Sequence, residues 1–355
     1  MSIIFSKENI CLIDHMDFVT KCYSNVREKN YTKHYTLTPK LFSIKRKSII
    51  APSKQFRKRK HNDNVLEEAL TIQAIYNNLI ASLPTGLKTA VKTKYNTMDA
   101  SSLRDFSKNL FESTDYDHKD TSGGNNSEVP LICQIEGSDF LVPGKCRFKC
   151  GCVKEECKKL DGNKYDIVIA DPPWWNKYIR RLKKAAIKLS YSMMYNEEIA
   201  SIPINNLFSD TTLIAVWCTN SPSNINSVKE QFFPKWGVEY VTTWYWLKLT
   251  IDLEPICPFS SGSKKQPYER LIMGRRGDLK VPKNVVFASI PSSLHSHKPP
   301  LNDLFTYYNI STEGPHVLEL FARYLLPNTT SVGYEPLKWQ NLALYVEVDN
   351  KKNNV

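Results

Sequence analysis

The sequence predicts an α/β fold built on a mostly parallel sheet. Residues 165–170, Tyr-Asp-Ile-Val-Ile-Ala, form the kind of apolar run that central parallel strands carry, and the run stops at Asp171 and a proline pair. Downstream, further apolar runs alternate with helical or loop segments, which is the pattern of βα units. A chain of 355 residues with 41% hydrophobic residues exceeds one average domain, so a second, smaller part is expected.

We expect that smaller part to be a basic, mainly helical module over residues 1–114. Its clearest element is an amphipathic helix over 64–83, with apolar residues at helical spacing: Leu66, Leu70, Ile72, Ile75, Leu79 and Leu83. Before it, the segment from Lys40 to Lys60 holds nine Lys or Arg and no acid. Such a block, which includes Lys58 and Arg59, is typical of a nuclear-import signal or a phosphate-binding arm, and equally of a solvated loop.

A flexible linker is predicted over 115–130, because Asp, Ser, Gly, Asn and Lys dominate it. The sheet domain then covers 131–348, and a polar tail covers 349–355. Within the sheet domain the predicted strands are 165–170, 212–218, 239–249, 269–274, 285–290, 317–322 and 330–333, and the predicted helices are 179–190, 223–232 and 300–308.

The tetrapeptide Asp171-Pro172-Pro173-Trp174 follows the first of these strands, at the sheet edge where ligands of open α/β sheets bind. The Asp171 carboxylate and the Pro172 carbonyl are acceptors that can hold both hydrogens of an exocyclic amine. The prolines stiffen the loop and leave its carbonyls free, and Trp174 offers a ring for stacking a base. The alternative is a strand-ending turn with an aromatic side chain that only packs.

Three later segments occur in a fixed order after this tetrapeptide: Leu-His-Ser-His-Lys-Pro-Pro (294–300), Leu-Glu-Leu-Phe-Ala-Arg (318–323) and Val-Gly-Tyr-Glu (332–335). With Lys-Gln-Pro-Tyr-Glu (265–269), they make residues 131–348 resemble the adenine amino-methyltransferase family that includes the messenger-RNA N6-methyladenosine writer. The similarity is greatest to the branch called methyltransferase-like protein four. It implies a permuted Rossmann-like, S-adenosylmethionine-dependent fold, because the catalytic strand precedes the strand 317–322 that binds the methyl donor.

The resemblance also implies roles for individual residues. Asp171, Pro172, Pro173 and Trp174 would be catalytic and hold the target adenine. Lys298 would face the carboxylate of S-adenosylmethionine, and Arg323 would lie along its ribose. The expected cofactor-binding residues are Asp171, Pro172, Lys298, Phe321, Arg323, Tyr334 and Glu335.

Three positions depart from the family pattern near the expected donor site. Tyr334 replaces the asparagine that relatives carry between Gly333 and Glu335, and Leu325 stands close to where an asparagine often follows the arginine. Upstream of the catalytic strand, Cys150-Gly151-Cys152-Val153 occupies the place of an aspartate. We therefore expect donor affinity to differ more from the family than target-base chemistry does.

The charge of the chain, +12 with a pI near 9.1, favours a polyanionic partner. A second basic cluster directly follows the tetrapeptide and would meet a nucleic-acid backbone at the rim of the base pocket: Lys177, Arg180, Arg181, Lys183, Lys184 and Lys188. Because the pocket residues do not separate RNA from DNA, three hypotheses stand. The first is adenine N6-methylation of RNA, for which the resemblance implies (2′-O-methyl)adenosine of U2-type small nuclear RNA. The second is the same chemistry on nuclear or mitochondrial DNA. The third is a catalytically weak binding protein or partner subunit.

Other site chemistries have weaker support in the sequence. His295 and His297 could share a metal ion, but no third ligand is apparent, so no metal is expected. The cysteines at 146, 150, 152 and 157 match no usual zinc spacing, and an odd total of nine without a signal peptide indicates reduced thiols. No run of 18 apolar residues is present, so a membrane partner is not expected. We expect a nuclear protein, with a possible cytosolic or mitochondrial pool, that acts as a monomer.

Overall fold

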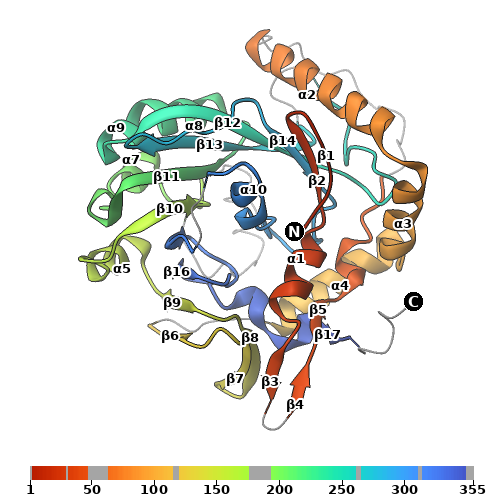
Figure 1. Cartoon of the computed structure of the whole chain (residues 1–355), viewed down its shortest axis with the longest axis horizontal. Coiled ribbons are helices and arrows are strands. Elements are labelled where there is room, and N and C mark those ends of the chain that lie inside the picture. The colour runs from red at the N-terminus through yellow and green to blue at the C-terminus, as the bar shows by residue number, and fades with distance from the viewer. Residues whose placement is uncertain are drawn as a thin grey trace.

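A computed structural model describes residues 2–28, 31–46, 63–114, 120–175, 193–260, 265–310 and 314–348. Its centre is an eleven-stranded sheet with the order β1-β2-β14-β12-β13-β11-β10-β15-β16-β9-β6 (Figure 1). In that order the strands are Ile3–Lys7, Ile10–Ile13, Val286–Ser289, Glu239–Lys248, Tyr268–Arg276, Phe208–Cys218, Tyr165–Ala170, Val317–Leu320, Thr329–Gly333, Cys146–Cys150 and Ser122–Asn125.

Five neighbouring strands, β11, β10, β15, β16 and β9, run parallel. They confirm the predicted parallel core, and the predicted strands 165–170, 239–249 and 330–333 match the observed bounds to within one residue. The chain passes from β10 to β11 on one side, whereas β15 lies on the other. Strand β10 therefore stands where the strand order reverses, the place where α/β sheets bind ligands.

Both faces of the sheet are covered. In Figure 1 the sheet follows an arc, with α10 (Asn302–Tyr307) inside it and the other helices of this domain outside it. Those outer segments are α5 (Val153–Lys159), α7 (Asn196–Ala200), α8 (Pro222–Ser227), the π-helical turn Val228–Phe232 and α9 (Phe233–Trp236). Along β10, Val168 packs on the outer side and Ile167 and Ile169 pack on the inner side, because side chains alternate along a strand. A strand buried on both sides reads as a continuous apolar run, which is why it was visible in the sequence.

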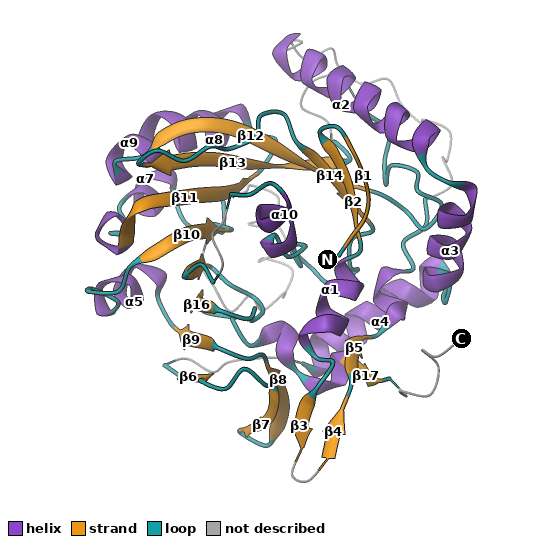
Figure 2. Ribbon diagram, viewed as in Figure 1, coloured by secondary structure: helices purple, strands orange, loops and turns teal. Residues whose placement is uncertain are grey.

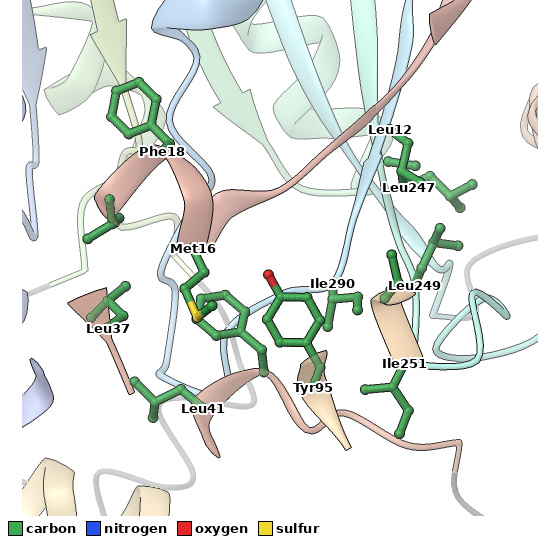
Figure 3. Packing of buried hydrophobic residues seen from close by; sticks show 14 of the residues in the cluster. Leu12, Met16, Phe18, Leu37, Leu41, Tyr95, Leu247, Leu249, Ile251 and Ile290 are labelled. Carbon is green, nitrogen blue, oxygen red and sulfur yellow. The ribbon is translucent and has the colours of Figure 1, made fainter. Parts of the chain in front are cut away.

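The amino-terminal part differs from the predicted helical module. Strand β2, fully buried, pairs in parallel with β14, so residues near the amino terminus extend the central sheet. Strand β5 (Tyr35–Leu37) pairs with β17 (Tyr345–Glu347), and α1 (His15–Cys22) packs between these strands and the sheet. Figure 3 shows Met16 and Leu41 from this part in one hydrophobic cluster with Leu249 of the segment after β12. The apolar runs at 3–5 and 10–13 are too short to be assigned without their partners.

Three longer helices complete the amino-terminal part and are visible in Figure 2: α2 (Asp63–Ser82), α3 (Thr85–Tyr95) and α4 (Ala100–Ser113). The predicted helix 64–83 is confirmed as α2, but Leu70 is 56% exposed and does not belong to its buried side. The side that faces the protein instead contains Ala69, Ile72 and Leu79, which are spaced three or seven residues apart.

The predicted linker contains ordered structure. Within 115–130, residues Ser122–Asn125 form β6, which pairs with β9 at the edge of the central sheet. Gly124 lies so close to β9 that an added Cβ would stand 2.3 Å from the carbonyl oxygen of Cys146. The glycines here permit a close approach of two backbones, whereas the sequence had suggested chain flexibility.

The remaining elements lie at the periphery. A small sheet has the order β4-β3-β7-β8, with strands Tyr31–Lys33, Val26–Glu28, Leu131–Ile135 and Ser138–Val142. Short 3-10 turns occur at Pro39–Phe42, Asn205–Leu207, Lys338–Gln340 and Leu342–Leu344. The predicted helix 179–190 and the tail 349–355 lie outside the described residues. Within the described ranges, none of the helices combines the length and the apolar character that crossing a bilayer requires.

Candidate active site

The tetrapeptide 171–174 leaves the carboxyl end of β10 as a tightly held corner. The Asp171 backbone N–H donates to the carbonyl of Leu320 at 3.3 Å, which ties the corner to the neighbouring strand β15. The Trp174 N–H donates to the Pro172 carbonyl at 2.8 Å, and Met194 N–H donates to the Pro173 carbonyl at 3.0 Å. A carbonyl has two lone pairs, so the Pro172 oxygen keeps one for a ligand.

Two cavities meet at this corner. The larger has a volume of about 1030 Å³ and the smaller about 240 Å³, and both are lined by Asp171, Pro173 and Arg323. The corner therefore separates two compartments that open toward the same carboxylate. Such an arrangement suits a reaction between two bound molecules.

The smaller cavity is built at the ends of four adjacent parallel strands. Cys152 and Val153 follow β9, Asp171 follows β10, Phe321 follows β15 and Tyr334 follows β16. Aromatic and aliphatic side chains form most of this wall, and Glu335, Arg323 and Lys154 add polar groups. A flat nucleoside with a hydroxylated sugar matches that mixture.

The backbone of the smaller cavity is strained at Phe321, whose φ is +61°. A non-glycine residue in this region costs on the order of 1–3 kcal/mol, and such residues cluster at functional sites. Across from it, a Cβ on Gly333 would stand 3.0 Å from the nitrogen of Ala322. Strands β15 and β16 thus end in two closely packed turns that aim Phe321 and Tyr334 into the cavity.

Glu335 is held by two cations at the base of the smaller cavity. Its Oε1 lies 2.6 Å from Lys338 Nζ and its Oε2 lies 3.4 Å from Arg323 Nε, and the residue is 3% exposed. A carboxylate keeps further lone pairs after two such contacts. The structure therefore brings Glu335 and Arg323 together and holds both in fixed orientations.

A chain of alternating charges runs along the larger cavity. Lys298 Nζ lies 2.8 Å from Glu269 Oε2 and 3.4 Å from Asp171 Oδ2, and Glu269 also contacts Lys248. Burial lowers the pKa of Lys298, but the two carboxylates outweigh it and leave that pKa raised. For Glu269, burial raises the pKa and the two lysines outweigh it, so that its pKa falls well below the ordinary value. Lys298 and Glu269 are therefore both charged at neutral pH.

The larger cavity has a positive balance. Among its described lining residues, four cations, Lys248, Lys265, Lys298 and Arg323, face the two carboxylates Asp171 and Glu269. Burial and the neighbouring cations lower the pKa of His295 to about 4, so this residue is neutral at pH 7. An excess of two positive charges favours a ligand that carries a carboxylate or a phosphate.

Trp174 has a structural environment that the sequence did not reveal. Its ring is stacked on Phe232 at a centroid distance of 5.8 Å, and its Nε1 donates to the carbonyl of Trp217 at 3.1 Å. The residue is 8% exposed, yet it lines the larger cavity. The base-stacking role stays a prediction, and it is now restricted to the ring face that Phe232 leaves uncovered.

Other residues of the larger cavity were not identified from the sequence. Ser296 Oγ donates to Asp171 at 3.4 Å, and Asn220 and Trp217 contribute from the end of β11. The segment 265–269 marked the place of Glu269 but gave it no role. The apolar run ending at 218 could have pointed to 219 and 220, because the ends of parallel strands lie along one edge of a sheet.

The two histidines of segment 294–300 point to different places. His295 lines the larger cavity, whereas His297 is 4% exposed and packs on His15 at a ring-centroid distance of 4.5 Å. The extended geometry that would direct both rings to one side is absent, because Ser296 between them has a φ of +59°. In the described part of the chain, no group of three His, Cys, Asp or Glu side chains could hold a metal ion.

The four clustered cysteines do not converge on one point. Cys146, Cys150 and Cys157 are buried in apolar clusters, whereas Cys152 is exposed at the smaller cavity. Burial raises the pKa of the Cys146 and Cys157 thiols to about 12, which keeps them protonated and unreactive.

The predicted nucleic-acid contacts fall on segments outside the described residues. Lys177, Arg180, Arg181, Lys183 and Lys184 lie outside the described residues, and so do Lys58 and Arg59. Of their surroundings, the structure describes Trp175, whose ring is stacked on Tyr195 at 6.0 Å. Tyr195 is 57% exposed, so an aromatic pair stands beside the corner at the protein surface.

Comparison with known proteins matches the sheet that carries both cavities. The MT-A70 family model matches residues 165–335. Residues 165–335 are similar to an MT-A70 domain. The match begins with β10 and ends at Glu335, so it includes the corner 171–174 and the charged residues that line the larger cavity. MT-A70 methyltransferases depend on S-adenosylmethionine, and the sheet described above has the Rossmann-like organisation of that class.

Three relatives illustrate the range of this family. A Caenorhabditis elegans protein named DNA N6-methyl methyltransferase is 39% identical over 218 residues, which is 59% of this chain and 57% of the relative. The human N(6)-adenine-specific methyltransferase METTL4 is 35% identical over 240 residues, 64% of this chain and 49% of the relative. The N6-methyladenosine RNA methyltransferase MTA1 of Cryphonectria parasitica is 34% identical over 215 residues, 58% of this chain and 62% of the relative. The chain thus spans about half to three fifths of the length of these relatives.

The residues present fit S-adenosylmethionine. The smaller cavity offers aromatic and aliphatic surfaces for a nucleoside and a buried, oriented carboxylate, Glu335, for sugar hydroxyls. Lys298 has three donors, and the cavity around it has an excess of cations, so a carboxylate can join Asp171 and Glu269 there. The two features lie on either side of Asp171, which would place a sulfonium centre near the corner.

Proposed function

We propose that this protein transfers a methyl group from S-adenosylmethionine to the exocyclic 6-amino group of adenine in a nucleic acid. The observation that carries the proposal is the acceptor corner, Asp171 and the Pro172 carbonyl, at the junction of a nucleoside-sized cavity and a larger cationic cavity. The MT-A70 match over 165–335 supports it.

The corner explains how a weak nucleophile could be used. The lone pair of an aromatic amine is delocalised into the ring, and two acceptors that hold its hydrogens favour a nitrogen whose lone pair is directed at the methyl group. S-adenosylmethionine, when bound, supplies that methyl group on a positively charged sulfur. As the nitrogen–methyl bond formed, the methyl–sulfur bond would break and leave S-adenosylhomocysteine as a neutral thioether, and the nitrogen would release one proton to water. Lys298 and Ser296 would keep the Asp171 carboxylate oriented during this transfer. Catalysis would thus rest on positioning and electrostatics, with no covalent enzyme intermediate.

For the substrate, we propose RNA, with (2′-O-methyl)adenosine of U2-type small nuclear RNA as the first candidate. The basis is the order of motifs that the chain shares with the METTL4 branch, together with the charge of +12. DNA is the second candidate, because the relative from Caenorhabditis elegans is named as a DNA methyltransferase. The basic block 40–60 leads us to propose a nuclear location, and we propose that the protein acts as a monomer.

One experiment tests chemistry and substrate together. Purified protein is incubated with methyl-labelled S-adenosylmethionine and matched single-stranded RNA, 2′-O-methylated RNA, single-stranded DNA and duplex DNA, and the nucleosides are analysed by mass spectrometry. We expect N6-methylated adenine, most rapidly in the 2′-O-methylated RNA. Product from DNA alone would overturn the RNA assignment, and absence of product from all four would overturn the enzymatic proposal. Comparison of nucleosides from cells with and without the protein then identifies the natural substrate.

A further inference from the structure

The side chain of Glu68 on helix α2 binds residues at the back of the larger cavity. Its Oε2 accepts from Tyr245 Oη at 2.7 Å and its Oε1 accepts from Tyr268 Oη at 2.9 Å. Both oxygens also accept from the guanidinium of Arg270, which makes the ion pair bidentate. Glu68 is about 200 residues distant in sequence from Tyr268 and Arg270.

Arg270 is buried between that carboxylate and the cavity wall. Its side chain is 3% exposed, and its remaining terminal nitrogen, Nη1, donates to Oδ1 of Asn220. A guanidinium has only donors, so the amide of Asn220 can face Arg270 only through its oxygen. The contact therefore fixes which end of the Asn220 amide points away from Arg270.

That other end, the amide NH₂ group, has no hydrogen-bond partner among the described residues, and Asn220 lines the larger cavity. Asn220 follows β11, which is parallel to β10, so it stands at the same sheet edge as Asp171. The cavity thus has acceptors at the corner and a pre-oriented donor on the neighbouring strand end.

This pattern is complementary to one side of adenine. The 6-amino group is a donor, and a ring nitrogen that is only an acceptor lies beside it on either edge, N1 or N7. An amide nitrogen facing such a ring nitrogen would reject bases that present a donor at that place. A phosphate oxygen is also an acceptor and is the alternative ligand for the Asn220 amide. If the amide bound a phosphate, it would have no influence on which base is selected.

We infer that Asn220 is a specificity-determining residue that donates to a ring nitrogen of the target adenine, and that Glu68 positions it through Arg270. This inference rests on the proposed function. It also gives helix α2, which lies outside the MT-A70 match, a part in substrate selection.

The first test removes the donor and keeps the contact to Arg270. Asn220→Asp has the same shape and still offers an oxygen to the guanidinium, whereas it places an acceptor against the ring nitrogen. We expect KM for an adenine oligonucleotide to rise about tenfold, which corresponds to about 1.4 kcal/mol, while S-adenosylmethionine affinity and melting temperature stay close to wild type. Asn224→Asp is the matched control, because it adds the same charge four residues away, where the amide bonds to Thr219 and does not line the cavity.

Modified substrates identify the ring nitrogen. Oligonucleotides in which the target is 7-deazaadenine or 1-deazaadenine lack one acceptor each. With the wild-type protein, one of the two should lose about tenfold in kcat/KM, and with Asn220→Asp that penalty should disappear. Equal penalties in both proteins, or an unchanged KM for Asn220→Asp, would overturn the inference while leaving the methyltransferase proposal intact. Wild-type protein without activity on any adenine substrate would instead overturn the proposed function.

The second test addresses Glu68. Glu68→Gln should raise the substrate KM several-fold, whereas Glu67→Gln, an exposed neighbour on the same helix, should have no effect. A merely structural role would lower the melting temperature without changing KM. In a double-mutant cycle, Glu68→Gln should add little to the KM of Asn220→Asp, because both act on the same contact. Additive effects would show that Glu68 does not act through Asn220.

Discussion

The two cavities at Asp171 are built on different principles. The walls of the smaller one follow directly after four adjacent parallel strands, β9, β16, β15 and β10. The larger one draws on antiparallel strands, the segment 294–300 and, behind its wall, helix α2. The smaller cavity is a product of local strand-to-turn geometry, whereas the larger depends on charged groups paired across long sequence separations. Changes around the larger cavity should therefore affect both stability and activity, whereas changes in the smaller should mainly affect ligand affinity.

The largest effect is expected at the corner that the cavities share. Asp171→Asn keeps the shape but removes the charge, so that one acceptor for the amine and a partner of Lys298 are lost. We expect kcat to fall by about a thousandfold or more, in the range found when a preorganised polar group is removed, and the fold to be retained. Single-turnover kinetics with mass spectrometry measure this. Asp166→Asn, on the same strand at its other end, is the control, and near-wild-type activity of Asp171→Asn would disprove the corner's role.

The next prediction concerns Lys298, which joins two carboxylates in the larger cavity. Lys298→Met would leave Asp171 and Glu269 without this cation, and breaking a buried pair typically costs about 3–5 kcal/mol of unfolding free energy. We also expect the dissociation constant for S-adenosylmethionine to rise at least tenfold, measured by calorimetry. A stable variant with unchanged donor affinity would contradict both the pairing and the predicted carboxylate contact.

Glu319 gives a prediction about pH. It is buried on β15, and burial together with the charge of Asp171 raises its pKa to about 8. A carboxyl with a raised pKa contributes stability that is present below the unfolded value, 4.5, and is lost as pH rises toward 8. Glu319→Gln should therefore match wild type near pH 4.5 and be more stable by roughly 3 kcal/mol at pH 7.

Urea unfolding at several pH values tests this, and Glu269→Gln provides a contrast of opposite sign. The pKa of Glu269 is lowered, so its contribution is present above pH 4.5 and is lost as pH falls below it. At pH 7 wild type should be more stable than Glu269→Gln and less stable than Glu319→Gln. Both differences in unfolding free energy should become smaller as the pH falls. A pH-independent difference for Glu319→Gln would show that this carboxyl ionises normally.

The smallest effect is expected in the smaller cavity. Tyr334 is partly exposed there, and relatives were expected to carry an asparagine at this position. Tyr334→Asn should change the dissociation constant for S-adenosylmethionine a few-fold toward tighter binding, because an amide adds a donor for the ribose, on the order of 1 kcal/mol. Melting temperature and kcat should hardly change. Weaker binding would mean that the phenol ring itself packs on the donor.

Sequence analysis identified those parts of the protein whose structure is set by residues that are consecutive in the chain. The run 165–170 was recognisable as a central strand because both of its faces are buried, and the turn that follows it carried its chemistry in four consecutive residues. Phe321, Arg323, Tyr334 and Glu335 were assigned from the family resemblance, and the structure places each of them shortly after the end of a strand. The roles assigned to these residues stay predictions, whereas their convergence on Asp171 is observed.

Other features had no local signal. The glycines of β6 suggested a linker because the backbone they approach, at Cys146, is a separate segment of the chain. The short run at 10–13 became a strand by pairing with β14, and the run at 3–7 pairs with it in turn. Trp174 packs on Phe232, 58 positions later.

The sequence by itself determined the parallel core, the position of the tetrapeptide 171–174 at the end of a strand and the similarity of residues 165–335 to the MT-A70 family, because apolar runs and the turns after them are encoded in consecutive residues. Only the tertiary structure decided that the amino-terminal part completes the sheet, that Glu68 and Arg270 pair behind the cavity, and that the Asn220 amide oxygen faces Arg270. The physical reason is that a buried charge or amide is oriented by whichever partner folding brings to it. The residues next to that charge or amide in the chain do not indicate which partner this will be.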